Sequence, residues 1–354
     1  MGLNVGAWIL LFLSSLALLS LIKFLHKVWW VPTRIKHVFS SQGVKGPPYR
    51  FIHGNTKEIA AMKDQARSPF TNISHDNLKS SKKLQAIEAS LQQDLISEHF
   101  IRKCSGTAFT IFKSSDELKS DELQKGIEDL IMETIKERGK IMAVDPDTAD
   151  FLGQLVKANH ETDESYHVSI QDIIDECKTF YVSGDGTTSL VLSWAVLLLS
   201  IHTEWQERAR HEIGMIINET LRLYPPGIAI IRKNEREVKL GNLVIPANVI
   251  LHVPVLALHH DRTIWGEDAH LFNPERFSEG ISKATKNNPS AYMPFGFGHR
   301  NCVGSNFATN TAKITLAMIL QRYRFTPSPN YIHSPVHLLM LVPKNGVQVM
   351  LHAL

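Results

Sequence analysis

The first hydrophobic pattern is an uncharged apolar run over residues 1–22. As a helix it would be about 33 Å long, which is enough to cross the hydrocarbon core of a bilayer. The run has neither the positive leader nor the small-residue cleavage site of a signal peptide, the alternative interpretation. The pattern therefore predicts an uncleaved, single-pass transmembrane anchor over residues 1–24.

Positive charge follows this run, and no acidic residue occurs before Glu58. Trp29 and Trp30 stand where aromatic side chains gather at a membrane interface, and Gly46, Pro47 and Pro48 predict a stiff extended break. We therefore expect a basic, proline-containing linker over residues 25–50 and a body over residues 51–354. Because positive flanks stay on the cytosolic side, the body should face the cytosol.

Within the body the hydrophobic period changes from helical to strand-like. Amphipathic patterns over 79–100 and 115–140 predict helices, and an apolar run over 170–199 predicts a buried helix with a notch of small residues at 183–188. After Pro225, short apolar runs at 228–231, 238–240, 243–245 and 249–253 predict strands, and Asn345 with Gly346 predicts a hairpin. The fold class is mainly α with small β-sheets (α+β).

Composition narrows the possible partners. The 354 residues are 44% hydrophobic and 21% charged, and the net charge is +3. The basic residues are not gathered into arginine-rich runs, so nucleic acid is not an expected partner. Cys104, Cys177 and Cys302 are too few and too widely spaced for a disulfide framework or a zinc module.

The segment PFGFGHRNCVG, residues 294–304, carries the most specific chemistry. A thiolate that ligates iron needs a rigid loop that directs backbone N–H groups toward the sulfur, and glycines allow that close approach. The alternative for a single cysteine is a buried free thiol beside a turn. The pattern F-x-x-G-x-R-x-C-x-G makes that alternative weak. Its members are Phe295, Gly298, Arg300, Cys302 and Gly304.

On this segment the chain resembles the cytochrome P450 superfamily, and two further motifs extend the resemblance. NETLRLYPP is similar to the family's E-x-x-R helix, with Glu219 and Arg222, and the segment around Arg276 is similar to its P-E-R-F segment. Glu219 and Arg222 lie three residues apart on one helical face, so both can meet Arg276 in a buried charge network. The HHD string at 259–261 resembles a structural turn of the family.

The notch at 183–188 resembles the family's distal helix motif: a small residue, Gly, any residue, an acid, Thr and Thr. The resemblance assigns Thr187 to proton delivery at iron-bound oxygen, but Gly186 occupies the acidic position and Asp185 lies one residue earlier. The alternative for Thr187 is a hydroxyl that bonds back to its own helix. By the same resemblance Arg232 binds a haem propionate through a charge-assisted pair.

The resemblance implies an incomplete cytochrome P450 fold that binds haem b through Cys302. It implies electrons from an NADPH-dependent flavoprotein reductase, membrane lipid as a further partner and residence in the endoplasmic reticulum. The leader WWVPTRIKHVFSSQGVKGPPYRFIHGNTKEI resembles plant enzymes of the clan that hydroxylates brassinosteroids, gibberellins and triterpenoids. A bulky, hydrophobic small-molecule substrate is the corresponding expectation.

Two stretches of the family's usual length of about 500 residues are missing. Residues 77–109 lack the helix with Trp and Arg that contacts a propionate, and Ile213 joins Gly214 abruptly where helices usually intervene. Two hypotheses follow. In the first, the chain is an active haem-thiolate monooxygenase. In the second, it is a catalytically silent truncated or splice product that binds haem weakly or does not fold.

Overall fold

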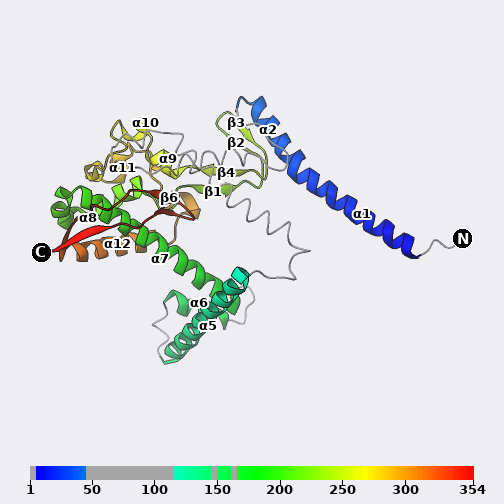
Figure 1. Ribbon diagram of the computed structural model, residues 1–354, viewed down its shortest axis with the longest axis horizontal. Coiled ribbons are helices and arrows are strands. Elements are labelled where there is room, and N and C mark those ends of the chain that lie inside the picture. Colours follow the sequence, from blue (N-terminus) through cyan, green and yellow to red (C-terminus); the bar gives the residue numbers. More distant parts are fainter. Residues whose placement is uncertain (1–4, 45–114, 145–149, 161–165) are drawn as a thin grey trace. The chain divides into compact units, whose positions relative to one another are not determined.

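The computed structural model describes residues 5–44, 115–144, 150–160 and 166–354 (Figure 1). The chain divides into two compact units. The first comprises Met1–Asp94 with Ala229–Ala257, and the second comprises Leu95–Ile228 with Leu258–Leu354. The stretch 77–109, in which the propionate-contacting helix is expected to be missing, the first amphipathic helix and the Gly46–Pro48 break all lie outside the described residues.

The amino-terminal helix of the first unit extends beyond the predicted anchor. Helix α1 (Val5–Leu25) continues through a π-helical turn, η1 (His26–Trp30), into α2 (Val31–Ser41). Residues 11–41 are apolar and long enough to cross a membrane by length and composition. The part of the expected linker that the structure describes is therefore helical as far as Ser41.

Two small antiparallel sheets complete this unit. Strand β1 (Ile230–Lys233) pairs with β4 (Ile250–Val253), and β2 (Val238–Leu240) pairs with β3 (Leu243–Ile245). The Gln42 amide donates to the Val244 carbonyl at 3.0 Å and accepts from its N–H at 2.7 Å, so the end of α2 is held against β3. All four predicted strands are confirmed, and the bounds of β2 and β3 equal the predicted ranges.

The long helix of the second unit is α7 (Ile170–Ile201). It begins at a capping box, in which Ser169 accepts from the Asp172 N–H and the Asp172 carboxylate accepts from the Ser169 N–H. The small-residue notch does not interrupt the helix. Only part of this helix is buried, however. Residues 180–185 are exposed, whereas Val191, Trp194, Ala195 and residues 197–200 are buried.

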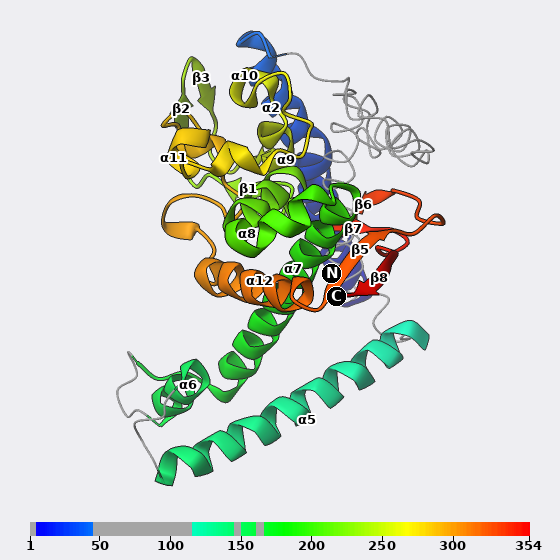
Figure 2. The ribbon, with the colours of Figure 1, turned by 90° about the vertical axis from the view of Figure 1, so that its left-hand side faces the viewer.

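Two helices pack beside the beginning of α7. Helix α5 (Ser115–Val144), which confirms the prediction for 115–140, and α6 (Phe151–Asn159) both contact α7. Ile135, Val156, Ile173 and Ile174 form a small buried cluster there, and Lys178 of α7 pairs with Glu128 of α5 at 2.7 Å. Figure 2 shows these helices along the beginning of α7.

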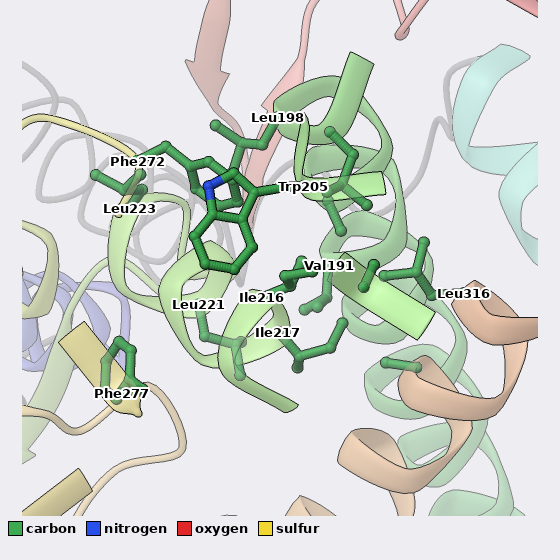
Figure 3. Packing of buried hydrophobic residues seen from close by; sticks show 14 of the residues in the cluster. Val191, Leu198, Trp205, Ile216, Ile217, Leu221, Leu223, Phe272, Phe277 and Leu316 are labelled. Atoms are coloured by element: carbon green, nitrogen blue, oxygen red, sulfur yellow. The ribbon is translucent and has the colours of Figure 1, made fainter. Parts of the chain in front are cut away.

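The main core lies where α7 packs against α8 (Glu204–Leu223) and α12 (Ser305–Leu320). Its buried side chains include Val191, Leu198, Ile216, Ile217, Leu221 and Leu316 (Figure 3). Phe272 and Phe277, from the segment between α8 and α12, belong to the same cluster. Short elements connect this core to the ligand loop. They are α9 (Val255–His259), α10 (Arg262–Trp265), η4 (Pro274–Phe277), α11 (Ile281–Ala284) and η5 (Pro289–Ala291), and η6 (Gly298–Arg300) lies within the loop itself.

Helix α8 is kinked at the place where the sequence indicated a missing stretch. Glu212 adopts non-helical backbone angles, with φ −124° and ψ 28°, immediately before the Ile213–Gly214 join. Two helical segments therefore meet there at a break, in agreement with the abrupt join expected from the sequence.

The predicted hairpin around Asn345 and Gly346 is wrong. Strand β7 (Leu341–Pro343) pairs with β6 (Pro335–His337), whereas β8 (Val349–Ala353) pairs with β5 (Tyr323–Pro327). The Gly346 N–H donates to the Pro343 carbonyl at 3.0 Å, so the local turn exists. The two strands that flank the turn pair with different partners and belong to different sheets. The turn therefore links two sheets and does not close a hairpin.

Candidate haem-thiolate site

Cys302 lies at the end of a tight loop between Tyr292 and α12. Its N–H donates to the Phe295 carbonyl at 2.7 Å, and the Asn301 N–H donates to the Gly298 carbonyl at 3.1 Å. These bonds close the loop on itself. Helix α12 begins at Ser305, so the sulfur stands just before a helix amino terminus, where a negative charge is stabilised.

Glycine is required at two positions of the loop. Gly296 and Gly298 have φ angles of +84° and +78°, which other residues rarely adopt. A Cβ atom at Gly304 would lie 4.0 Å from Cys302 Sγ, which is an ordinary van der Waals distance, so Gly304 lies directly beside the sulfur. The expected loop residues are thus brought together on one rigid turn.

Interactions with the core fix the beginning of the loop. The Met293 N–H donates to His259 Nε2 at 3.0 Å, and the Tyr292 hydroxyl donates to the Asn218 carbonyl at 2.9 Å. His259 is fully buried and stacks on Tyr292, and burial, helped by the charges of His260 and Arg222, lowers the pKa of His259 to about 3. The ring is therefore neutral at physiological pH, and the HHD string has the structural role expected of it.

The thiol itself is exposed and is surrounded by apolar surface. Cys302 is a free cysteine, Val303 and Phe307 are 84% and 75% exposed, and Phe297 is also exposed. Arg300 is exposed on the same loop, whereas the Phe295 side chain packs against the main core. An open thiol beside apolar surface and a cation suits a flat apolar ligand with an acidic edge.

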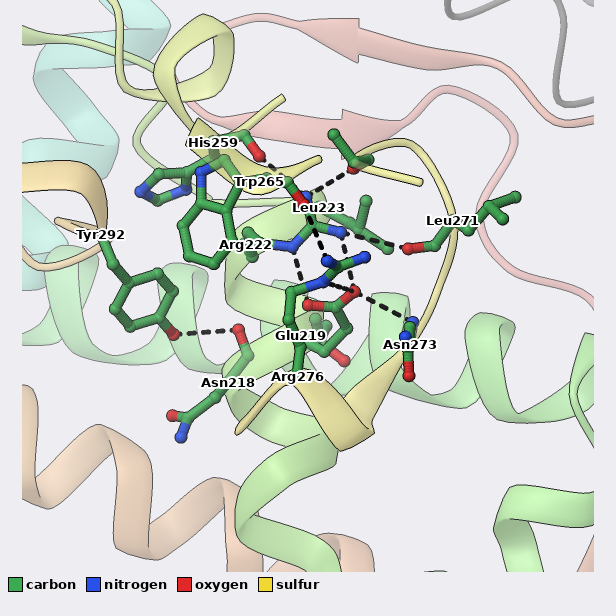
Figure 4. A network of polar contacts seen from close by, with 12 residues as sticks. Asn218, Glu219, Arg222, Leu223, His259, Trp265, Leu271, Asn273, Arg276 and Tyr292 are labelled. Atoms are coloured by element: carbon green, nitrogen blue, oxygen red, sulfur yellow. Dashed lines mark hydrogen bonds and ion pairs between the residues drawn. The ribbon is translucent and has the colours of Figure 1, made fainter. Parts of the chain in front are cut away.

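A buried charge network behind the loop confirms the expectation for the E-x-x-R motif. Arg222, which is fully buried, uses all five of its N–H donors: two on the Glu219 carboxylate at 2.7 Å, and one each on the carbonyls of His259, Ala269 and Leu271 (Figure 4). Glu219 Oε1 also accepts from the Asn273 N–H at 3.0 Å. The network ties α8 to the segment that leads into the loop.

Arg276 joins this network from η4. Its Nε lies 3.6 Å from Glu219 Oε1, and its terminal nitrogens bind Asp268 and the Trp265 carbonyl. The Arg276 guanidinium holds the pKa of the Asp268 carboxyl below its usual value. The three motif residues therefore meet as the sequence predicted, and they orient the chain without taking part in chemistry.

Thr187 lies on α7, which packs on α12 in the same unit as Cys302. Its hydroxyl donates to the Ser183 carbonyl at 2.5 Å, which is the back-bonded arrangement that the sequence left open as the alternative. Asp185 is exposed. A back-bonded hydroxyl keeps its oxygen available as an acceptor, so proton delivery by Thr187 stays a prediction.

Arg232 belongs to the other unit, where it lies on β1. It is exposed, and its guanidinium donates to the Ile231 carbonyl at 2.9 Å. Its pairing with a propionate also stays a prediction.

Sequence reasoning missed a contact between α7 and the β6–β7 turn. A Cβ atom at Gly186 would lie 3.0 Å from Met340 Cε. The two residues are 154 positions apart (340 minus 186), and no local pattern in the sequence relates them.

Comparisons with known proteins agree with this geometry. A family model described as cytochrome P450 matches residues 72–350. The cytochrome P450 CYP749A22 of Panax ginseng is 35% identical to the chain over an alignment of 505 positions, which covers 97% of this chain and 96% of that protein.

The chain belongs to the cytochrome P450 family. It is also 42% identical to the 11-oxo-beta-amyrin 30-oxidase of Glycyrrhiza uralensis and 38% identical to cytochrome P450 734A1 of Arabidopsis thaliana. These matches cover 69% and 73% of this chain but only 52% and 54% of those proteins. Apart from the ginseng protein, the chain spans about half the length of such relatives, in agreement with the truncation expected from the sequence.

A solved structure supports the fold. The cyanobacterial cytochrome P450 CYP120A1, determined with retinoic acid bound, matches with a TM-score of 0.54 at 26% identity. The match covers 62% of this chain and 55% of that chain. The mainly helical fold with small sheets is therefore confirmed.

Haem iron is the cofactor of this family, and the residues around Cys302 fit it. The fit rests on the free, exposed thiol, on the two positive-φ glycines that set the loop, and on the apolar surface beside the sulfur. Among the residues that the structure describes, no cluster of three or more His, Cys, Asp or Glu side chains could hold a metal ion in another way.

Proposed function

We propose that the chain is a haem-thiolate monooxygenase in which the Cys302 thiolate would hold the haem iron. The observation that carries this proposal is a free, exposed thiol on a rigid, glycine-determined loop in a chain of the cytochrome P450 family. When bound, haem would activate molecular oxygen so that one oxygen atom enters a C–H bond of the substrate.

The chain's own residues would bind and orient this group. Cys302 Sγ donates electron density as the ligand, and the Phe295–Gly304 loop holds the sulfur at a fixed position through the 2.7 Å bond from Cys302 N. Arg300 would supply a positive charge for an acidic edge of the cofactor, and the family resemblance gives Arg232 the role of a propionate partner. Gly298 provides the positive-φ turn of the loop, Phe295 packs the loop against the main core, and Gly304 lies beside the sulfur.

Thr187 is the residue proposed to move protons. Its Oγ1 donates to the Ser183 carbonyl, and the lone pairs of the same oxygen can accept a hydrogen bond from a water molecule. A water held there would deliver a proton to the reactants beside Thr187, which is general acid catalysis through a positioned hydroxyl.

The substrate is proposed to be a bulky, apolar small molecule such as a triterpenoid. The support is the similarity to an enzyme named for oxidising 11-oxo-beta-amyrin at position 30. Electrons would come from an NADPH-dependent flavoprotein reductase. We place the chain in the endoplasmic reticulum membrane with its body toward the cytosol, on the support of the apolar helix over 11–41 and the positive residues around its end.

A second candidate, a silent truncated product, is favoured by two structural observations. The kink at Glu212 shows two helical segments meeting at an abrupt join. Ile314 and Met318, four residues apart on α12, are exposed apolar side chains beyond those beside Cys302. Uncovered apolar surface of this kind lowers stability and promotes association.

Turnover distinguishes the two candidates. The chain is reconstituted with haem, a flavoprotein reductase and NADPH in lipid vesicles and incubated with 11-oxo-beta-amyrin. A hydroxylated product from the wild type, and none from Cys302→Ala, supports the monooxygenase. Normal turnover by Cys302→Ala overturns it. Absence of product from both, with haem retained, favours the silent product.

A further inference from the structure

Four aromatic side chains meet at the carboxyl end of α8, apart from the ligand loop and the buried charge network. The rings of Trp194 and Tyr224 stack, with centroids 4.4 Å apart and planes inclined by 12°. The Tyr224 hydroxyl lies 3.2 Å from His333 Nε2, and the Tyr331 hydroxyl lies 2.9 Å from His333 Nδ1. This aromatic cluster joins the buried part of α7, the end of α8 and the connection between β5 and β6.

His333 is hydrogen-bonded to a phenol on each side of its ring. Burial lowers the pKa of His333 to about 4, so at physiological pH the ring is neutral and has one N–H and one lone pair. One phenol therefore donates to the imidazole, and the other accepts from it. Burial raises the pKa of both Tyr224 and Tyr331, so both phenols keep their protons. A protonated phenol thus has a base already bound to its hydroxyl.

This arrangement suits the loss of one electron from a phenol. An oxidised phenol is a strong acid, and its formation is easiest where a positioned base takes the proton at once. The electron leaves to a one-electron oxidant, the proton moves along the existing hydrogen bond to His333, and a neutral tyrosyl radical and an imidazolium remain. One electron from a reductant reverses both transfers. Trp194, stacked on Tyr224, extends the path of the electron into the core.

Tyr292 shows by contrast what the cluster adds. It is also buried and also stacks on a histidine ring, that of His259, at 5.3 Å. Its hydroxyl, however, donates to the Asn218 carbonyl at 2.9 Å. A peptide carbonyl accepts a hydrogen bond but is a far weaker base than imidazole, so it cannot take the proton. Tyr292 should therefore resist oxidation, and it provides a matched control within the same chain.

We propose that the aromatic cluster is a site of reversible one-electron oxidation, in which a tyrosine gives its electron to an oxidant and its proton to His333. Trp194 is the inner end, fully buried on α7 and seven residues, or about 10 Å along the helix, after Thr187. Tyr331 is the outer end, 9% exposed and followed by the exposed Ile332. Oxygen activation at haem supplies a suitable oxidant, so the role of draining oxidising equivalents that no substrate consumes rests on the proposed function.

The oxidation itself is tested first, on the full chain without haem in lipid nanodiscs. A ruthenium polypyridyl complex, oxidised by a laser flash and a quencher, removes one electron, and transient absorption detects tyrosyl radicals. Wild type should give a long-lived tyrosyl signal. His333→Gln, which keeps hydrogen-bonding groups but loses the proton acceptor, should lower that signal about 2- to 12-fold. Tyr292→Phe should leave it unchanged.

Two further measurements keep this test decisive. Either Tyr224→Phe or Tyr331→Phe should remove the long-lived signal, which identifies the oxidised phenol. In wild type exchanged into heavy water, electron paramagnetic resonance of the radical should show coupling to a deuteron held by an imidazole nitrogen. An equal signal from wild type and a folded His333→Gln, a signal that survives both tyrosine substitutions, or absence of that deuteron coupling overturns the proposal.

The draining role is tested next with the haem-loaded chain. Hydrogen peroxide is added without substrate, and bleaching of haem is followed optically. The tyrosine variant that lost the radical should bleach about twofold faster or more, whereas Tyr323→Phe, on an exposed residue of β5, should match wild type. Equal bleaching of all three proteins overturns the draining role.

The two parts separate the outcomes. If the chain bound no haem at all, the proposed function would fail while the haem-free test still reported on the aromatic cluster. If haem bound normally and the cluster gave no long-lived radical, the inference alone would fail.

Discussion

Glu219 and Arg222 show how one pair of residues supports the ligand loop without touching the sulfur. Both are fully buried, and every donor of the guanidinium has a partner. The three carbonyls that Arg222 binds come from the segment preceding the loop. A buried charge that is this completely paired is costly to disturb, because removing one partner leaves the other without compensation.

We therefore expect Glu219→Gln to lower the free energy of unfolding by about 3 to 5 kcal/mol, since it strands the Arg222 charge in the core. Denaturant unfolding of the chain in detergent measures the change. Arg262→Ala is the matched control, because its pair with Glu267 has side chains that are 45% and 88% exposed and should contribute less than about 1 kcal/mol. Equal effects of the two substitutions would contradict the assignment of Glu219 to a buried network.

His259 gives the loop a dependence on pH. Burial lowers its pKa to about 3 from an ordinary value of 6.5, so between these values the unfolded chain binds a proton that the folded chain does not. Its stabilising contribution is therefore complete above pH 6.5 and is lost as the pH falls toward 3, at about 1.4 kcal/mol per pH unit. Protonation of Nε2 would also remove the acceptor for Met293 N–H.

His259→Phe tests this dependence, because it keeps a ring against Tyr292 but removes the titrating nitrogen. At pH 7.5 the variant should be less stable by about 1 to 3 kcal/mol, since Met293 N–H loses its partner. The difference between wild type and variant in unfolding free energy should narrow between pH 6.5 and 4.5, because only the wild type loses the His259 contribution. A difference that is constant across this range would contradict the buried, neutral state of His259.

At the scale of elements, local sequence patterns correctly predicted those features that depend only on residues close together in the chain. The strands at 238–240 and 243–245, the helix at 115–140 and the Glu219–Arg222 spacing all follow from short-range pattern and turn chemistry. The hairpin around Gly346 failed because pairing is decided by partners far away in the chain: β5 for β8, and β6 for β7. The Gly186–Met340 contact could not be predicted for the same reason, since the two residues lie far apart in the chain.

The join in α8 carries the element-scale prediction. Restoring between Ile213 and Gly214 the helices that the family usually places there should remove the kink at Glu212 and raise resistance to proteolysis. Limited proteolysis of the chain and of the restored version in the same membranes measures this. An inserted flexible Gly-Ser linker of equal length is the control and should give no protection. Equal resistance of all three proteins would show that the join is tolerated.

At the scale of the whole molecule, the sequence identified the family and predicted the ligand loop and the truncation, but it did not predict which apolar helix faces are exposed. The exposed apolar side chains of Ile314 and Met318 on α12 became visible only once the faces toward α7 and α8 were known. Packing between residues far apart in the chain determines which part of α12 is exposed. The loop around Cys302, by contrast, is specified by eleven consecutive residues, Pro294 to Gly304.

The central claim is that Cys302 ligates haem iron, and the optical spectrum of the reduced, CO-bound chain tests it most directly. Wild type, Cys302→Ala and Cys177→Ala are purified with haem and compared, with Cys177, a half-buried residue of α7, as the control. We expect the Soret band of a thiolate-ligated haem from wild type and Cys177→Ala, and its loss from Cys302→Ala. A thiolate spectrum that persists in Cys302→Ala, or that disappears in Cys177→Ala while the protein stays folded, would contradict the assignment.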